Sequence, residues 1–63
     1  MKMVGFYDLP DGRAAYEGIE TELEPTEDLS ARARADIRLS LRARVEGAGF
    51  VFDPEAVKFT DWT

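Results

Sequence analysis

The chain has 63 residues, a net charge of −5 at pH 7, and neither Cys nor His. A chain of this length folds as one domain, residues 1–63, because it buries only ~60% of the surface that its unfolded form exposes. The missing residue types exclude disulfides, thiolate nucleophiles, an ordinary His base for a Ser nucleophile, and nitrogen or sulfur metal sites. We therefore expect no enzymatic activity, no metal and no cofactor.

The first third of the chain predicts a β-hairpin. Residues 3–7 are rich in strand formers, and the Leu-Pro-Asp-Gly sequence at residues 9–12 is a strong turn signal. The second strand would run from Arg13 to about Leu23. The apolar side chains of residues 13–23 also fit one stripe of a helix, which remains the alternative for this segment.

The middle of the chain predicts a long amphipathic helix from Thr26 to Glu46. Its apolar residues recur every four positions and form one stripe: Leu29, Ala33, Ile37, Leu41 and Val45. Acidic residues follow Thr26 directly, where the helix dipole favours them, and Gly47 is the expected C-cap.

The last segment predicts a second hairpin. Apolar residues alternate in residues 50–53 and again in residues 57–62, on either side of a turn that contains Pro54. One set would face the helix: Phe50, Phe52, Val57 and Phe59. The other set would lie on the opposite face of the sheet: Val51, Thr60 and Trp62.

Together these elements predict an α+β fold with two layers, in which an antiparallel sheet of three to four strands packs on one long central helix. The element order would be ββαββ, or βααββ if residues 13–23 are helical. No segment approaches the ~18–20 consecutive apolar residues that cross a bilayer. Arg is preferred over Lys and Ala is common, as in high-GC bacterial or phage genomes. We expect a protein of the bacterial cytoplasm that makes no membrane contact.

Charge is unevenly distributed along the chain. Residues 1–29 carry eight acidic side chains against Lys2 and Arg13, whereas residues 30–46 carry five Arg. Three of these, Arg34, Arg38 and Arg42, form a line along the helix that would suit either surface ion pairs or phosphate contacts. The overall negative charge opposes direct binding of DNA or RNA, so we expect a protein partner with a basic surface.

The candidate partner-binding residues are seven carboxylates and one aromatic side chain: Asp11, Glu17, Glu20, Glu22, Glu24, Glu27, Asp28 and Trp62. The carboxylates form either a solvated face or an imitation of a phosphate backbone that enters a DNA or RNA channel. Trp62 would either cap the core or anchor an interface.

A small acidic α+β chain with this cluster of carboxylates resembles phage-encoded anti-CRISPR proteins in length and charge. The resemblance implies a non-enzymatic inhibitor that binds a Cas subunit, in some members as a DNA mimic. The alternative is a small regulatory or assembly protein, such as an antitoxin or a phage structural adaptor, that binds one protein through the helix or Trp62. We expect a monomer or a weak homodimer in either case.

Overall fold

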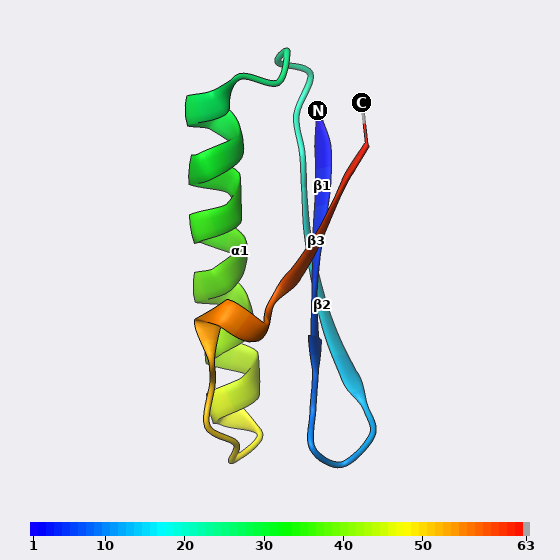
Figure 1. The fold of residues 1–63 in the computed structure, drawn as a ribbon, viewed down its shortest axis with the longest axis vertical. Coiled ribbons are helices and arrows are strands. Elements are labelled where there is room, and N and C mark those ends of the chain that lie inside the picture. The colour runs from blue at the N-terminus through cyan, green and yellow to red at the C-terminus, as the bar shows by residue number, and fades with distance from the viewer. Residues whose placement is uncertain (63) are drawn as a thin grey trace.

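The computed structural model describes the backbone of residues 1–62 and the side chains of residues 1–60. It is a two-layer α+β fold in which one long helix packs against one face of a three-stranded antiparallel sheet (Figure 1). The strand order is β2-β1-β3, with β1 in the centre. The elements in chain order are β1 (Lys2–Asp8), β2 (Ala14–Glu20), α1 (Glu27–Gly47), the 3₁₀ helix η1 (Pro54–Ala56) and β3 (Lys58–Trp62).

The first hairpin is confirmed. The Leu9 N–H donates to the Arg13 carbonyl over 2.8 Å, and the Gly12 N–H donates to the Leu9 carbonyl over 3.1 Å. Gly12 has φ of 91°, a value that favours glycine and lets the chain reverse direction. The helical alternative for residues 13–23 is wrong, because β2 pairs with β1 along its whole length. The strand ends at Glu20, three residues before the predicted end.

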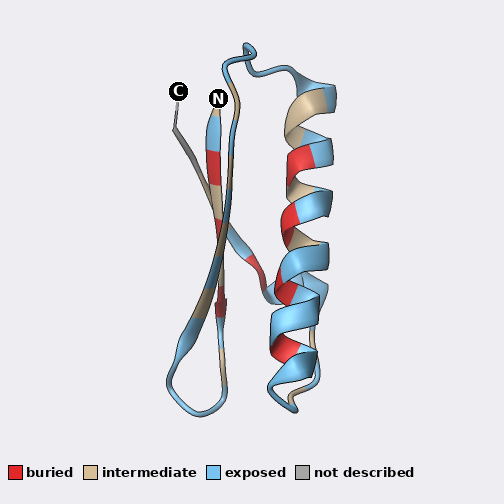
Figure 2. Cartoon of the chain, turned by 180° about the vertical axis from the view of Figure 1, so that it is seen from behind, coloured by how far each residue is buried: buried red, intermediate tan, exposed pale blue. Residues whose placement is uncertain are grey.

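The predicted helical stripe lies against the sheet and forms most of the core (Figure 2). Among the described side chains, the buried hydrophobic residues are Met3, Tyr7, Ala33, Ile37, Leu41, Val45 and Val57. Three aromatic rings that were expected to face the helix pack against this core and are partly buried: Phe50, Phe52 and Phe59. The spacing of four residues therefore predicted the buried face of α1 correctly.

The start of α1 is fixed by its N-cap. The Thr26 hydroxyl accepts a hydrogen bond from the Leu29 N–H over 3.1 Å, which satisfies one of the free N–H groups of the first turn. Glu27 and Asp28 occupy the first turn, as the helix dipole favours. No helix in the described part of the chain is both long and apolar enough to cross a bilayer.

The end of α1 lies one residue beyond the predicted end, because the C-cap is Ala48 and not Gly47. Gly47 is still helical, and Gly49 is the residue with positive φ, 91°. The Gly49 N–H donates to the Glu46 carbonyl over 3.0 Å, and the Phe50 N–H donates to the Val45 carbonyl over 3.1 Å. This pair of hydrogen bonds is a Schellman motif, in which glycine stands after the C-cap.

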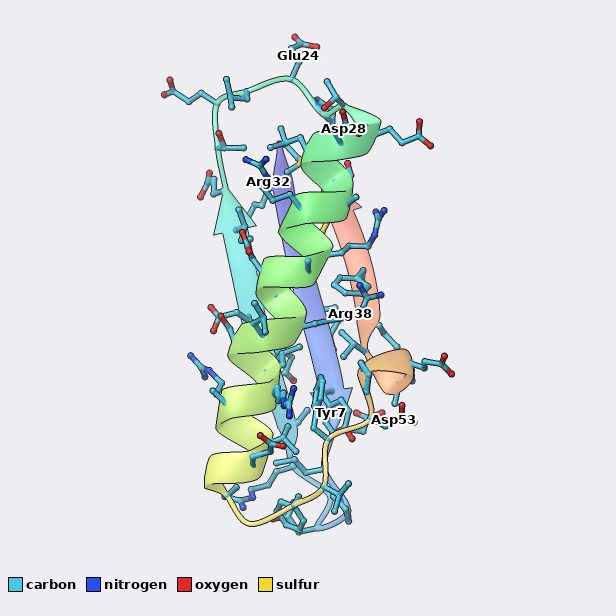
Figure 3. The ribbon with its side chains drawn as sticks, turned by 90° about the vertical axis from the view of Figure 1, so that its left-hand side faces the viewer. Tyr7, Glu24, Asp28, Arg32, Arg38 and Asp53 are labelled. Atoms are coloured by element: carbon cyan, nitrogen blue, oxygen red, sulfur yellow. The ribbon has the colours of Figure 1, made fainter. Side chains whose placement is uncertain are left out.

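The second predicted hairpin is wrong, because residues 50–53 do not join the sheet. The Tyr7 hydroxyl accepts from the Asp53 N–H over 3.0 Å and donates to the Val51 carbonyl over 3.4 Å, so a side chain holds this segment in place of a strand ladder (Figure 3). Val51 is 92% exposed and does not lie on the sheet. Only β3 follows, which makes the order ββαβ.

Candidate functional site

The structure separates the predicted acidic residues into three places. Five of them lie where the loop after β2 leads into α1, at one end of a molecule that measures 36 × 17 × 16 Å (Figures 1 and 3). We call these five the acidic end: Glu20, Glu22, Glu24, Glu27 and Asp28. Asp11 lies in the turn between β1 and β2, at the opposite end (Figure 1). Glu17 lies between the two, within β2.

Asp11 has a local role in its turn. One carboxylate oxygen accepts from the Arg13 backbone N–H over 3.0 Å, and the other lies 2.7 Å from the Arg13 guanidinium. The hydrogen bond from the Arg13 side chain lowers the pKa of the Asp11 carboxyl. Arg13 therefore compensates this charge, and Asp11 does not share a surface with the acidic end.

Glu17 is on the helix-facing side of β2 and pairs with α1. Its carboxylate lies 3.3 Å from Nε of Arg44, and its side chain is only 28% exposed. Glu17 is therefore less accessible to a partner than the carboxylates of the acidic end. Arg44 lies outside the line of Arg34, Arg38 and Arg42 for which ion pairs were predicted.

The carboxylates of the acidic end are all exposed, and the loop that carries several of them is held at both ends. The Met1 amino group donates to the Thr21 carbonyl over 2.6 Å and to the Leu23 carbonyl over 3.1 Å. The Leu23 N–H donates to the Thr21 hydroxyl over 3.3 Å. The Thr26 N-cap fixes the other end of the loop at the start of α1.

A shallow hollow of about 330 Å³ lies within the acidic end, lined by Met1, Glu22, Leu23, Glu24 and Pro25. Leu23 is 64% exposed and provides an apolar surface beside two carboxylates. Arg and Lys bind such places well, because their aliphatic stems pack on apolar atoms while their charged groups meet the carboxylates. The hollow therefore suits a basic side chain of a partner.

Two cationic side chains lie close to the acidic end. Lys2 is opposite Glu20 in the pairing of β1 with β2. Arg32 lines a second hollow of about 230 Å³ together with Thr26, Asp28 and Leu29. Within the described residues, no group of three carboxylates is placed to hold a metal ion. The geometry therefore suits charge recognition by a protein surface.

The predicted line of arginines on α1 makes contacts within the chain. The Arg38 guanidinium lies 4.9 Å from the centre of the Phe59 ring, a cation–π distance, and its Nε donates to the Pro54 carbonyl over 3.4 Å. Arg42 pairs with Glu46 one turn away, at 3.2 Å. Two of the three arginines in the line therefore have partners within the chain, one of them in an ion pair, and phosphate binding by the line stays a prediction.

A second exposed surface, on the side of the sheet that faces away from α1, was not assembled by sequence reasoning. We call it the outer sheet face, and its centre consists of two rows across the strands: Gly18, Val4 and Thr60 in one, and Tyr16, Phe6 and Lys58 in the other. The Phe6 and Tyr16 rings meet edge to face at 5.3 Å, and Tyr16 remains 56% exposed. The alternation of residues 2–8 indicated which side chains of β1 share a face. Their neighbours on β2 and β3 are known only from the strand pairing in the structure.

Trp62, the predicted aromatic anchor, is the last residue of β3 and pairs with Lys2 in the sheet register. Its side chain lies outside the described residues. The chain matches no model of a known protein family, no curated protein and no solved structure. A function is therefore inferred from the residues and their arrangement.

Proposed function

We propose that the protein is a non-enzymatic inhibitor that binds a nucleic-acid-handling protein and places its acidic end in the DNA or RNA channel of that partner. The observation that supports this proposal is the hollow in the acidic end, which is lined by the exposed Leu23 together with Glu22 and Glu24. Nucleic-acid channels present the basic side chains that such a surface binds.

The proposed contact is charge-assisted at its centre. An Arg or Lys of the partner would pack its stem against Leu23 and Pro25 and direct its charged group to Glu22 and Glu24. Asp11 and Glu17 are left out of the contact, because Arg13 and Arg44 already pair with them. Binding of this kind weakens as salt rises, because ions screen exposed charges over ~8–10 Å at physiological salt.

The class of partner to test first follows from the resemblance in size and acidity to anti-CRISPR proteins. A CRISPR effector subunit holds nucleic acid in a positively charged channel, which suits an acidic end that is narrow and exposed. The molecule measures 17 × 16 Å across its two short dimensions, which suits a channel that holds a nucleic-acid duplex better than one that holds a single strand.

One observation favours a second candidate function, a regulatory or assembly protein that binds its partner through apolar contact. The exposed aromatic surface for such binding is the outer sheet face, where Tyr16 is 56% exposed beside Phe6. The solvent-facing side of α1 offers less, since Leu39 is its one large exposed hydrophobic side chain among the described residues. We therefore assign the apolar contact of this second candidate to the outer sheet face.

The experiment that tests the first proposal reverses three charges of the acidic end, E20K/E22K/E24K. We expect the affinity for the captured partner to fall at least about tenfold, because each charge-assisted hydrogen bond contributes ~1.5–3 kcal/mol. Glu27 and Asp28 are left unchanged, since they stabilise the first turn of α1. Affinity is measured by calorimetry, and folding by circular dichroism.

The matched control is D36K/E46K/E55K, which makes the same change in net charge at three exposed positions on α1 and η1. We expect this variant to bind with nearly the affinity of the wild type. An equal loss in both variants would indicate that only net charge matters. Full binding by a folded E20K/E22K/E24K variant would exclude the acidic end as the contact.

A further inference from the structure

We propose that two copies of the chain associate face to face through the outer sheet face. In this arrangement a two-fold axis lies between the two sheets. It is parallel to both sheets and perpendicular to their strands. The central strand β1 of one copy then crosses over β1 of the other, running in the opposite direction. This inference concerns self-association and is independent of the proposed function.

The first observation is that no element in the described part of the chain covers the outer sheet face, since α1 packs on the other side, and that the central rows of this face are apolar or small apart from Thr60 and Lys58 (Figure 1). Val4 and Phe6 are partly exposed, and Tyr16 is 56% exposed. A sheet of three strands with aromatic and β-branched residues on its open face gains stability when that face is packed.

The second observation is a hollow beside Tyr16 on the same face. It has a volume of about 210 Å³ and is lined by Lys2, Met3, Val4, Gly18, Ile19 and Glu20. Gly18 occupies the position next to Tyr16 on the outer side of β2 and provides no side chain there. The face therefore carries the protruding ring of Tyr16 and, in the next row, a recess at Gly18.

The proposed axis brings these two features together. The axis passes midway between two rows of residues, Val4 with Gly18 and Phe6 with Tyr16. The Val4 row of one copy therefore faces the Phe6 row of the other copy. Tyr16 of one copy then lies over Gly18 of the other, and Phe6 lies over Val4. Each aromatic ring thus faces a smaller residue, and the two-fold symmetry repeats each of these contacts once.

Charge is compatible with this axis, and the fit of Tyr16 against Gly18 selects it. The same operation sets Lys2 of one copy opposite Asp8 of the other, at the two ends of β1. Within each copy Glu20 lies opposite Lys2 in the sheet register and Lys58 pairs with Asp8 at 3.5 Å, so each end of the face carries both signs. A two-fold axis parallel to the strands would instead set Lys2 opposite Lys2 and Asp8 opposite Asp8. Like charges facing each other weaken an interface, and the perpendicular axis avoids this for Lys2 and Asp8.

The size of the face limits the affinity. Three strands ~4.8 Å apart and ~23 Å long give a contact of roughly 300–500 Å² per copy. Stable interfaces bury about 800 Å² per partner. The dimer is therefore weak, with a Kd between ~10 µM and ~1 mM.

The test is sedimentation equilibrium of the wild type between ~2 µM and ~2 mM, a range that spans the expected Kd. We expect the average mass to rise from the monomer value of 7.1 kDa toward twice that value. A Gly18→Val variant fills the hollow and should weaken association at least about tenfold, since the ring loses its place. An added Cβ at Gly18 meets Met3 O at 3.5 Å and Val4 Cγ2 at 3.6 Å, which are ordinary contacts within one copy.

The matched control is Ala14→Val, on the same strand and face but outside the pairing of Tyr16 with Gly18. We expect the dimer Kd of this variant to lie within about threefold of the wild-type value. A wild type that stays monomeric to ~2 mM would overturn the proposal, because weak association is expected well below that concentration. Equal association of Gly18→Val and the wild type would also overturn it.

A second series decides the outcome if Gly18→Val fails to fold. K2E and D8K should each weaken association about three- to tenfold, because each places like charges opposite one another. The double variant K2E/D8K should recover most of the wild-type affinity, since it exchanges the two charges. The Asp8 pair with Lys58, at 3.5 Å, is lost equally in D8K and in the double variant. A double variant no stronger than its two singles would exclude this axis.

Discussion

Gly5 determines how closely the helix approaches the sheet. It is buried at the centre of β1, and a Cβ added there would overlap Cγ2 of Ile37. Leu41 Cδ1 and Phe59 Cε1 would lie 3.4 and 3.5 Å from it. Ile37 and Leu41 have no exposed surface, so neither side chain has room to move aside.

We predict that Gly5→Ala lowers the free energy of unfolding by about 2 kcal/mol, the usual cost of overpacking a core. The matched control is Gly18→Ala on the neighbouring strand, where the added Cβ makes only ordinary contacts at 3.5 and 3.6 Å. We expect the control to remain within about 0.5 kcal/mol of the wild type. Urea denaturation measures both, and equal stabilities would contradict the close approach at Gly5.

At the level of single residues, charge counting predicted which carboxylates are present but not which are already paired. Asp11 pairs with Arg13, two residues away, and Glu17 pairs with Arg44, far along the chain. The first pair could be anticipated from the turn, because Asp often bonds the backbone two residues on. The second depends on how α1 crosses β2, which no local pattern specifies.

At the scale of elements, the sequence predicted what local signals decide. The first hairpin follows from its turn residues, and α1 follows from a spacing of four residues with Thr26 as its N-cap. The second hairpin failed because a distant side chain, the Tyr7 hydroxyl, holds residues 50–53 through Val51 and Asp53. Alternating apolar residues indicate which side chains face the core. They do not indicate whether the backbone forms hydrogen bonds with a neighbouring strand.

Two glycines at the end of α1 provide a test, because replacing them by Ala should change the stability of the fold in opposite directions. Gly49→Ala should destabilise the fold by about 1–2 kcal/mol, because φ of 91° is unfavourable for a residue with a Cβ. Gly47→Ala should stabilise it by about 0.5–1 kcal/mol, because this glycine is helical and an added Cβ meets nothing within 4 Å. Thermal unfolding of both variants checks this, and a loss of stability in Gly47→Ala would restore Gly47 as the cap.

At the scale of the whole molecule, two surfaces are separated by the fold. The acidic end lies at one tip of the 36 Å long axis, and the outer sheet face lies along its side. The sequence predicted the acidic end because its carboxylates are close together in the chain. It did not predict the outer sheet face as a unit, because Phe6, Tyr16 and Thr60 come together only through the sheet register.

Because the proposed dimer runs antiparallel, the acidic ends of its two copies would point in opposite directions. Glu22 and Glu24 would remain outside the contact between copies, since they lie beyond the end of β2. We therefore expect Gly18→Val to keep the affinity of the acidic end for its partner. Glu20 belongs to both surfaces, because it also lines the hollow of the outer sheet face, so the self-association of E20K/E22K/E24K is measured beside its affinity for the partner.

The most direct test of the proposed function is capture of partners from a bacterial lysate by the wild-type protein at ~0.1 M and at ~0.5 M salt, between which the screening length falls about twofold. Captured proteins are identified by mass spectrometry, and E20K/E22K/E24K serves as the control. We predict a nucleic-acid-handling protein, such as a CRISPR effector subunit, that is captured at low salt, lost at high salt, displaced by DNA or RNA, and absent with the variant. A partner that stays bound at ~0.5 M salt and binds the variant equally well would contradict the proposed function.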